Sequence, residues 1–317
     1  MLSRVAENLY WMARYVERAE NTARLISVNS SLLLDLPRGI APGWSPLISI
    51  MGLNSEFDSR VKEPGERQVV RFLVGDRGNS GSIISSLHHA RENCRTVRDI
   101  LPREIWENLN ELYLYAQESV NVGLTKQGRF DYLQQIIRGS ATFIGIIASV
   151  QSRDEAFDFL RIGRNLERAD MTTRIIDVRS ADLLPDDVAD LRPFDTIQWV
   201  SVLNSLSGYQ MYRRHMQMQV RRAAVLKFLL QDNRFPRAVR HCLDAVEACL
   251  VNLQNNEPVV KQLRLLVKKV ERAKVGQLEQ TALHDYIDEL QLSITKVHAA
   301  LAESYFPKPQ LQRQSAG

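Results

Sequence analysis

Cysteine is scarce in this chain of 317 residues, and the three that occur form no framework. Cys94, Cys242 and Cys249 are odd in number, lack the short spacing of a metal site, and fall within helical patterns. We therefore expect buried free thiols in a reducing compartment, without disulfides. We predict no metal site and no cofactor elsewhere in the chain.

Long apolar runs and a secretory leader are also missing. Arg4, Glu7 and Arg14 interrupt the first apolar positions, which a signal peptide would not tolerate. The most apolar run, 143–150, is far shorter than the roughly 20 residues that a bilayer requires. These absences predict a cytoplasmic protein without a membrane partner.

Motifs that carry chemistry are few. The glycine-rich segment 75–81 (GDRGNSG) lacks the lysine of a P-loop and follows no convincing strand. No histidine supplies the Glu-x-x-His pairs of a di-iron bundle, and no serine or cysteine nucleophile with an adjacent base stands out. We therefore name no catalytic residue, and leave open whether the chain is an enzyme.

Helical periodicity dominates what is present. In residues 1–34, apolar side chains recur at steps of three and four, which predicts a long helix with one apolar face. Further helices are predicted at 44–53, 69–74, 82–100, 102–124, 131–150, 154–179, 195–218, 235–250, 259–270 and 279–301. The charged segment 56–68 is predicted as an exposed loop, and 131–150, apolar on several sides, as a central helix. The fold class is therefore all-α.

A long segment of the first helix recurs 150 residues later. LYWMARYVERAENTARLISV at 9–28 resembles LRIGRNLERADMTTRIIDV at 160–178, so that Glu17-Arg18-Ala19 corresponds to Glu167-Arg168-Ala169. Two further matches keep the same order, Trp44 with Trp199 and 72–76 with 228–232. We predict a tandem duplication packed about a pseudo-two-fold axis, with repeats at 1–153 and 154–306 and a disordered tail at 307–317.

Charged residues recur with the duplicated segment and form a stripe on each helix. This candidate centre contains Arg14, Glu17, Arg18, Arg24, Arg164, Glu167, Arg168 and Arg174. Three interpretations are open: a solvated face laced with ion pairs, two stripes that pair across the pseudo-two-fold axis, or a cleft for an anionic ligand. The recurrence favours the last two.

Three further residues are secondary candidates: Asp76, Asp232 and Arg237. The two aspartates lie at loop-to-helix junctions, where we expect them to cap helices. A basic stretch at 213–240 is broken by one acid and interleaved with aromatic residues. Nucleic-acid binding would need such a patch, but a solvated face or an acidic protein partner explains it equally well, and we predict no nucleic-acid partner.

The opening of the chain resembles a known family. SRVAENLYWM at 3–12, followed by Arg14-Tyr15 and Glu17-Arg18-Ala19-Glu20, is similar to the opening of the bacterial alpha-E domain proteins. The segment LERAD at 166–170 and the residues Phe228, Leu229, Asp232, Pro236 and Arg237 resemble later motifs of that family. The resemblance covers nearly the whole chain.

The resemblance implies a helical protein without an established activity. Members of the family are typically encoded beside, or fused to, circularly permuted ATP-grasp proteins and transglutaminase-like proteases. That setting implies a non-catalytic accessory protein of a peptide-forming or peptide-modifying system, with these proteins as its partners. The alternative is an enzyme or an anionic-ligand-binding protein whose cleft lies at the doubled Glu-Arg motif.

Overall fold

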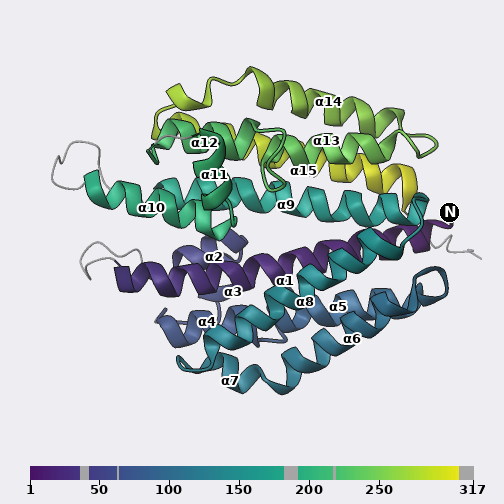
Figure 1. The fold of residues 1–317 in the computed structure, drawn as a ribbon, viewed down its shortest axis with the longest axis horizontal. Coiled ribbons are helices and arrows are strands. Elements are labelled where there is room, and N and C mark those ends of the chain that lie inside the picture. The colour runs from purple at the N-terminus through teal and green to yellow at the C-terminus, as the bar shows by residue number, and fades with distance from the viewer. Residues whose placement is uncertain (36–42, 63, 182–191, 217–218, 307–317) are drawn as a thin grey trace, which may run out of the picture.

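The chain folds as an assembly of α-helices (Figure 1). The computed structural model describes residues 1–35, 43–62, 64–181, 192–216 and 219–306, and this part of the chain contains no strand. The first half comprises α1 (Ser3–Asp35), α2 (Pro46–Met51), α3 (Asn54–Asp58), α4 (Glu66–Val74), α5 (Ile83–Thr96), α6 (Arg103–Glu118), α7 (Val120–Leu124) and α8 (Arg129–Val150). The second comprises α9 (Glu155–Ala181), α10 (Arg192–Ser205), α11 (Tyr209–Met216), α12 (Arg222–Gln231), α13 (Val239–Leu250), α14 (Glu257–Arg272) and α15 (Gln280–Tyr305). The all-α prediction is confirmed, whereas the tail predicted at 307–317 lies outside the described residues.

Helices α1 and α9 lie side by side at the centre and run in the same direction (Figure 1). They begin at the same end of the molecule, where the ammonium group of Met1 lies 2.8 Å from the carboxylate of Glu155. Helices α5, α6 and α8 lie on the α1 side of this pair, and α13, α14 and α15 lie on the α9 side. The two predicted Glu-Arg helices are therefore neighbours.

Contacts also cross between the two halves of the chain. The short helix α2 packs on α9, and α10 of the second half packs on α1. Such an exchange of equivalent elements is what a two-fold relation between repeats would produce. The tandem duplication itself, with its boundaries at 153 and 154, stays a prediction.

A glycine allows α1 and α9 to approach closely. A Cβ atom on Gly163 of α9 would lie 2.2 Å from the backbone oxygen of Tyr10 in α1. Real Cβ atoms do not come so near to a backbone atom, so any side chain at this position would push the helices apart. Gly163 therefore lies directly against the backbone of α1.

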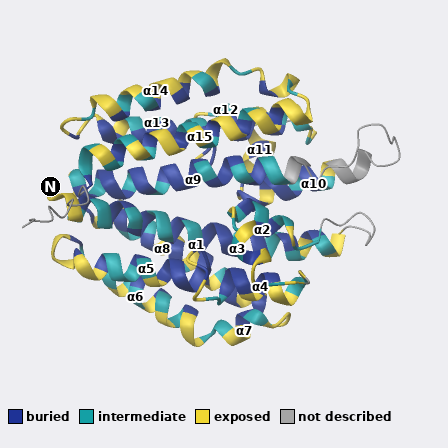
Figure 2. Cartoon of the chain, turned by 180° about the vertical axis from the view of Figure 1, so that it is seen from behind, coloured by how far each residue is buried: buried dark blue, intermediate teal, exposed yellow. Residues whose placement is uncertain are grey.

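Helix α1 is enclosed on most sides. Its predicted apolar stripe is buried from Leu9 to Ile26, whereas Leu2 at the free end is 77% exposed. Because α5, α8 and α9 surround the middle of α1, the polar residues from Glu17 to Thr22 are also withdrawn from solvent, except for Arg18. Figure 2 shows buried residues concentrated on α1 and α9 and exposed ones on outer helices such as α6 and α14.

Several secondary-structure predictions differ from the structure. The single helix predicted at 195–218 is divided, since α10 ends at Ser205 and α11 begins at Tyr209, and the helix predicted at 102–124 is divided into α6 and α7. The segment 56–68 was predicted as a loop, but α3 ends at Asp58 and α4 begins at Glu66, on either side of a short connection. Helix α8 was predicted to be central, yet one face with Arg138, Thr142 and Ser149 is exposed. Small residues along this face raised the apolar character of the segment without requiring burial.

One described helix, α8, is long and apolar enough to cross a membrane by length and composition alone. Its most apolar window is 33% buried, and it packs on α1, α6 and α7. The core helix of a folded domain meets the same criterion, so this is weak evidence. The absence of a membrane partner and the cytoplasmic location stay predictions.

Candidate functional site

Two ion pairs join α1 and α9 reciprocally. Nε and Nη2 of Arg168 donate to the two carboxylate oxygens of Glu17 at 2.9 and 2.7 Å. Nε and Nη2 of Arg18 donate in the same way to Glu167, at 2.7 and 3.1 Å. Each helix therefore supplies the carboxylate for the other helix's arginine, in the bidentate geometry that guanidinium groups favour.

Each of these two carboxylates also accepts a hydrogen bond from a second arginine. Nε of Arg14 donates to Glu167 at 2.7 Å, so Glu167 lies between two arginines of α1. Nη1 of Arg237 donates to Glu17 at 2.9 Å, so Glu17 also has two cationic neighbours. Arg237 comes from the loop between α12 and α13, far from α9 in sequence, and it was predicted only as a secondary candidate.

Arg237 ties that loop to three residues of α1. Besides Glu17, its Nη1 donates to Asn21 at 2.8 Å and its Nη2 donates to Glu20 at 2.6 Å. Its backbone carbonyl accepts a hydrogen bond from the hydroxyl of Thr172 on α9 at 2.9 Å. Both ends of Arg237 are thereby held, which fixes the guanidinium among the carboxylates.

Two arginines of the predicted stripe lie at its edge. Arg24 pairs with Glu20 at 2.7 Å and also donates to the hydroxyl of Ser207 at 2.7 Å. Arg174 pairs with Asp170 of its own helix at 2.8 Å. Because Glu20 also contacts Arg237, this pair connects Arg24 to the central cluster, whereas the Arg174 pair lies outside it.

We refer to the connected cluster as the ion-pair centre. It contains Arg14, Glu17, Arg18, Glu20, Arg24, Glu167, Arg168 and Arg237. Glu17 is 1% exposed and Glu167 is 2% exposed, so the interpretation of a solvated face is wrong. The stripes instead pair with each other between the two helices, as the second interpretation proposed.

The pKa values of the two central glutamates are lowered. Burial opposes ionisation of Glu167, but Arg18 and Arg14 outweigh it and lower its pKa to about 2. Burial likewise opposes ionisation of Glu17, but Arg168 and Arg237 hold its pKa well below the usual range. Both carboxylates are therefore ionised at neutral pH.

Positive charge is in excess in the ion-pair centre. Five arginines face three glutamates, so two positive charges have no counterpart within it. Burial and the neighbouring Arg168 lower the pKa of Arg237 although it contacts Glu17 and Glu20. The local balance of charge thus favours an additional anion.

Arg164 differs from the other arginines of the predicted stripe. Its counterpart Arg14 reaches Glu167, but the place beside Glu17 that Arg164 would occupy is taken by Arg168 and Arg237. The Nε atom of Arg164 is sealed from solvent and has no hydrogen-bond partner among the described residues. The structure therefore places Arg164 beside the centre without joining it.

The capping role expected for the two aspartates is not what the structure shows. Asp76 accepts a hydrogen bond from the backbone N–H of Gly78 at 2.8 Å, and α5 is capped by Ser82. Asp232 accepts from the N–H of Phe235 at 2.7 Å in the loop after α12. Both aspartates stabilise turns, and neither reaches the ion-pair centre.

A tyrosine–histidine pair extends from the centre and was missed in the sequence. The hydroxyl of Tyr10 lies 2.9 Å from Nδ1 of His298 on α15 and accepts from Nη1 of Arg14 at 3.0 Å. Burial and the nearby Arg14 lower the pKa of His298 to about 4, so its ring is neutral at pH 7. Since α1 and α15 are 288 residues apart here, only the tertiary fold reveals this contact.

One cluster has the donor set of a metal site. Asp177 of α9 and His284 and Asp288 of α15 lie close enough to share an ion. His284 and Asp288 are exposed, and Nδ1 of His284 lies 2.7 Å from Asp177. Exposed acidic groups commonly cluster in this way without a metal, so the predicted absence of a metal site stays a prediction.

Comparison with known proteins identifies the family. Residues 1–306 match the Alpha-E family, described as a predicted alpha-helical domain with a conserved ER motif. A Glu-Arg dipeptide occurs four times in the chain. Two of the four, Glu17-Arg18 and Glu167-Arg168, supply the residues of the reciprocal pairs.

Two curated relatives resemble nearly all of this chain. Uncharacterized proteins of Mycobacterium bovis and Mycobacterium tuberculosis are each 21% identical to it over 324 residues, which is 95% of this chain and 36% of each relative. The chain therefore spans about a third of the length of the curated relatives it matches. No solved structure matches it. With its family match from the first residue to the end of the last helix, the chain belongs to the Alpha-E family of helical domains.

Proposed function

We propose that this chain is a non-catalytic accessory protein of a peptide-forming or peptide-modifying system, in which the ion-pair centre holds α1 and α9 in register. The observation that carries the proposal is that each central carboxylate is already paired with arginines. Each of Glu17, Glu20 and Glu167 contacts two arginines within 3.1 Å. Carboxylates held in this way serve to join helices.

The same groups are poorly suited to acid–base catalysis. A general acid or base works best when its pKa lies near the operating pH. The pKa of Glu167, lowered to about 2, and that of Glu17, held well below the usual range, are far from neutrality. This electrostatic setting favours a structural role over an enzyme built on the doubled Glu-Arg motif.

The expected partners come from the family resemblance. A circularly permuted ATP-grasp protein is the principal one, with a transglutaminase-like protein as a second. The longer relatives agree with such an arrangement, because a chain like this one forms only about a third of each. A rigid helical module would then dock against, or be joined to, the part that forms the peptide bond.

Co-purification with the ATP-grasp protein tests this proposal. We expect the two proteins to remain together through size-exclusion chromatography, and peptide-bond formation to slow at least tenfold when this chain is omitted. A ligase that runs at full rate alone and never co-purifies would refute the accessory role.

A pair of variants separates the structural role of the centre from direct contact with the partner. Arg168→Met removes a buried ion-pair partner, so retention of the ligase should be lost only in parallel with thermal stability. The matched control is Arg103→Met on α6, where the side chain is 86% exposed and both properties should persist. Loss of the ligase from an Arg168→Met protein of unchanged stability would contradict the structural role.

A further inference from the structure

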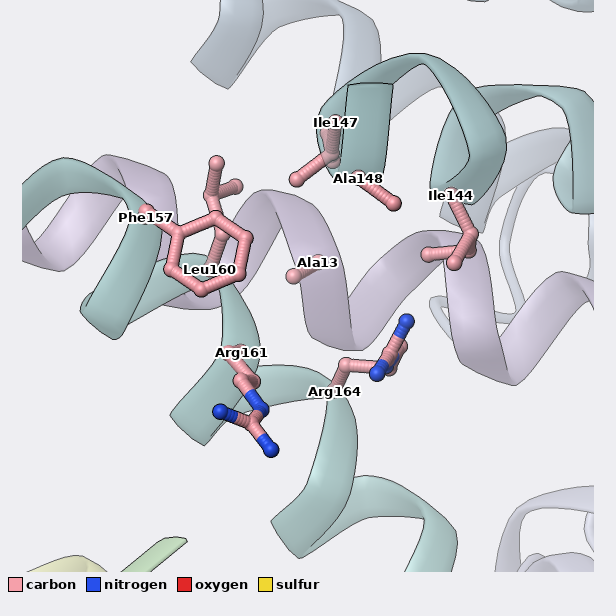
Figure 3. A pocket seen from close by; sticks show the side chains of 8 residues that line it. All are labelled: Ala13, Ile144, Ile147, Ala148, Phe157, Leu160, Arg161 and Arg164. Carbon is pink, nitrogen blue, oxygen red and sulfur yellow. The ribbon is translucent and has the colours of Figure 1, made fainter. Parts of the chain in front are cut away.

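A small cavity lies between α1, α8 and α9, next to the ion-pair centre (Figure 3). Its volume is about 70 Å³, and it is partly open to solvent. Ile144 and Ile147 of α8 form one wall, while Phe157, Leu160, Arg161 and Arg164 of α9 form the other. The cavity therefore combines a mainly apolar lining with two guanidinium groups one helical turn apart.

Arg164 is the group in this cavity without a counter-charge. Its Nε atom is buried and unpartnered among the described residues, and the nearest centre carboxylate, Glu17, is occupied by Arg168 and Arg237. Burial and the neighbouring Arg168 lower the pKa of Arg164 to about 10, which still leaves it charged at neutral pH. The Arg164 side chain is partly buried, and a charge withdrawn from water in this way is stabilised by an anionic partner.

The surroundings increase this need for an anion. The ion-pair centre already carries two more positive than negative charges, and Arg164 adds another beside it. None of the described residues that line the cavity is acidic. A bound anion would supply the negative charge that the lining of the cavity lacks.

We propose that this cavity binds a small organic carboxylate with a short branched apolar group. The carboxylate would pair with Arg164, which shares its helix face with Arg161. The apolar group would lie between Ile144, Ile147 and Leu160. A planar carboxylate has one polar edge, which suits donors on one side of the cavity. A phosphate would turn oxygens toward the isoleucines, where they would find no donor.

The carboxylate could belong to a free acid or to the C-terminus of a peptide that ends in a branched residue. Both present the same chemistry to Arg164. A free acid would occupy the cavity alone, whereas a peptide would extend through its open side. Two probes therefore distinguish the sources: 2-methylpropanoate for the free acid and N-acetylvaline for the peptide end.

Methyl-detected NMR titration of the full chain provides the test. We expect 2-methylpropanoate or N-acetylvaline to shift the Ile144 and Ile147 methyl signals with a Kd of about 1 mM or lower. The buried Ile287 methyl on α15 should not move. The neutral amides of the same molecules should bind about 10- to 100-fold more weakly, as expected for loss of a charge-assisted hydrogen bond.

Substitutions at the cavity, with a control elsewhere on α8, complete the experiment. Arg164→Met should abolish the preference for carboxylate over amide, while Arg138→Met on the exposed face of α8 should leave it intact. If Arg164→Met fails to fold, Ile147→Trp fills the cavity instead and should eliminate binding. Equal affinity for acid and amide, or absence of binding by either carboxylate at about 10 mM, would overturn the proposal. Tighter binding of N-acetylvaline would assign the site to peptide ends, and tighter binding of 2-methylpropanoate to free acids.

Discussion

Arg14 and Arg164 stand 150 residues apart at the same place in two similar helical segments, yet only Arg14 reaches a carboxylate, at 2.7 Å from Glu167. On Glu17 the second arginine is instead Arg237, which comes from the loop between α12 and α13. One member of the pair therefore stabilises the helix interface, and the other introduces a partly buried positive charge beside it.

This difference predicts opposite effects of the same substitution. Arg14→Met should lower the free energy of unfolding by about 1.5–3 kcal/mol, because it removes a hydrogen bond between charged groups. Arg164→Met should leave stability unchanged or raise it, since replacement of an unpaired buried charge by an apolar side chain removes a desolvation cost. Urea denaturation of the two variants and the wild type checks the prediction, and equal destabilisation by both would contradict it.

Acid should weaken the interface between α1 and α9. The pKa of Glu167 is about 2 in the folded protein, below its ordinary value of 4.5. As the pH falls, the unfolded chain therefore binds the proton first, and stability is lost between about pH 4.5 and pH 2. The slope of unfolding free energy against pH, measured by denaturation from pH 5 to pH 3, should be smaller in Glu167→Gln. An identical slope in that variant would show that the Glu167 ion pairs do not cause the pH dependence of stability.

Protonation of His298 should lower the stability of the folded protein at a higher pH than protonation of Glu167 does. Its pKa of about 4 lies below the ordinary value of 6.5, so stability is present above about pH 6.5 and declines as the pH falls toward 4. Asparagine at this position keeps an acceptor for Tyr10 but does not titrate. The melting temperature of His298→Asn should consequently change less between pH 7 and pH 5 than that of the wild type. Equal changes would show that another group dominates this range.

The glycine at the helix crossing should not tolerate even a methyl group. Gly163→Ala places a Cβ atom 2.2 Å from the backbone oxygen of Tyr10, and we expect a loss of about 1–3 kcal/mol or more from overpacking. Gly145→Ala on α8 is the matched control, because nothing lies within 4 Å of its Cβ position. That variant should gain about 0.5–1 kcal/mol from higher helix propensity. Guanidinium denaturation measures both, and a stable Gly163→Ala protein would contradict the close approach.

Helices and their buried faces were predictable from periodicity, which is a local property of the chain. The pattern of α1 from Leu9 to Ile26 reappears as its buried face, and the recurrence of Glu-Arg indicated that two charged stripes could meet. Exposure was harder to predict where small residues dominate, as in α8. An apolar composition shows that a residue can be buried, but packing decides whether it is.

Contacts at the site between residues far apart in the sequence could not be predicted in the same way. Arg237 contacts Glu17 across 220 positions, and Tyr10 contacts His298 across 288. No spacing rule links such pairs, because their proximity depends on how α9, α13 and α15 pack. The same packing decides which arginines reach Glu17, since its second arginine is the loop residue Arg237 and not Arg164.

The reciprocal pairing has a consequence for synthesis of the protein. Helix α1 leaves the ribosome first, but Glu17 and Glu20 meet Arg168 and Arg237 only after most of the chain has been made. Until then the apolar face of α1 lacks α9, and Glu17 lacks both of its arginine partners. The first helix to be translated is thus among the last to reach its final environment, and the nascent chain must remain protected from aggregation until residue 237 has emerged.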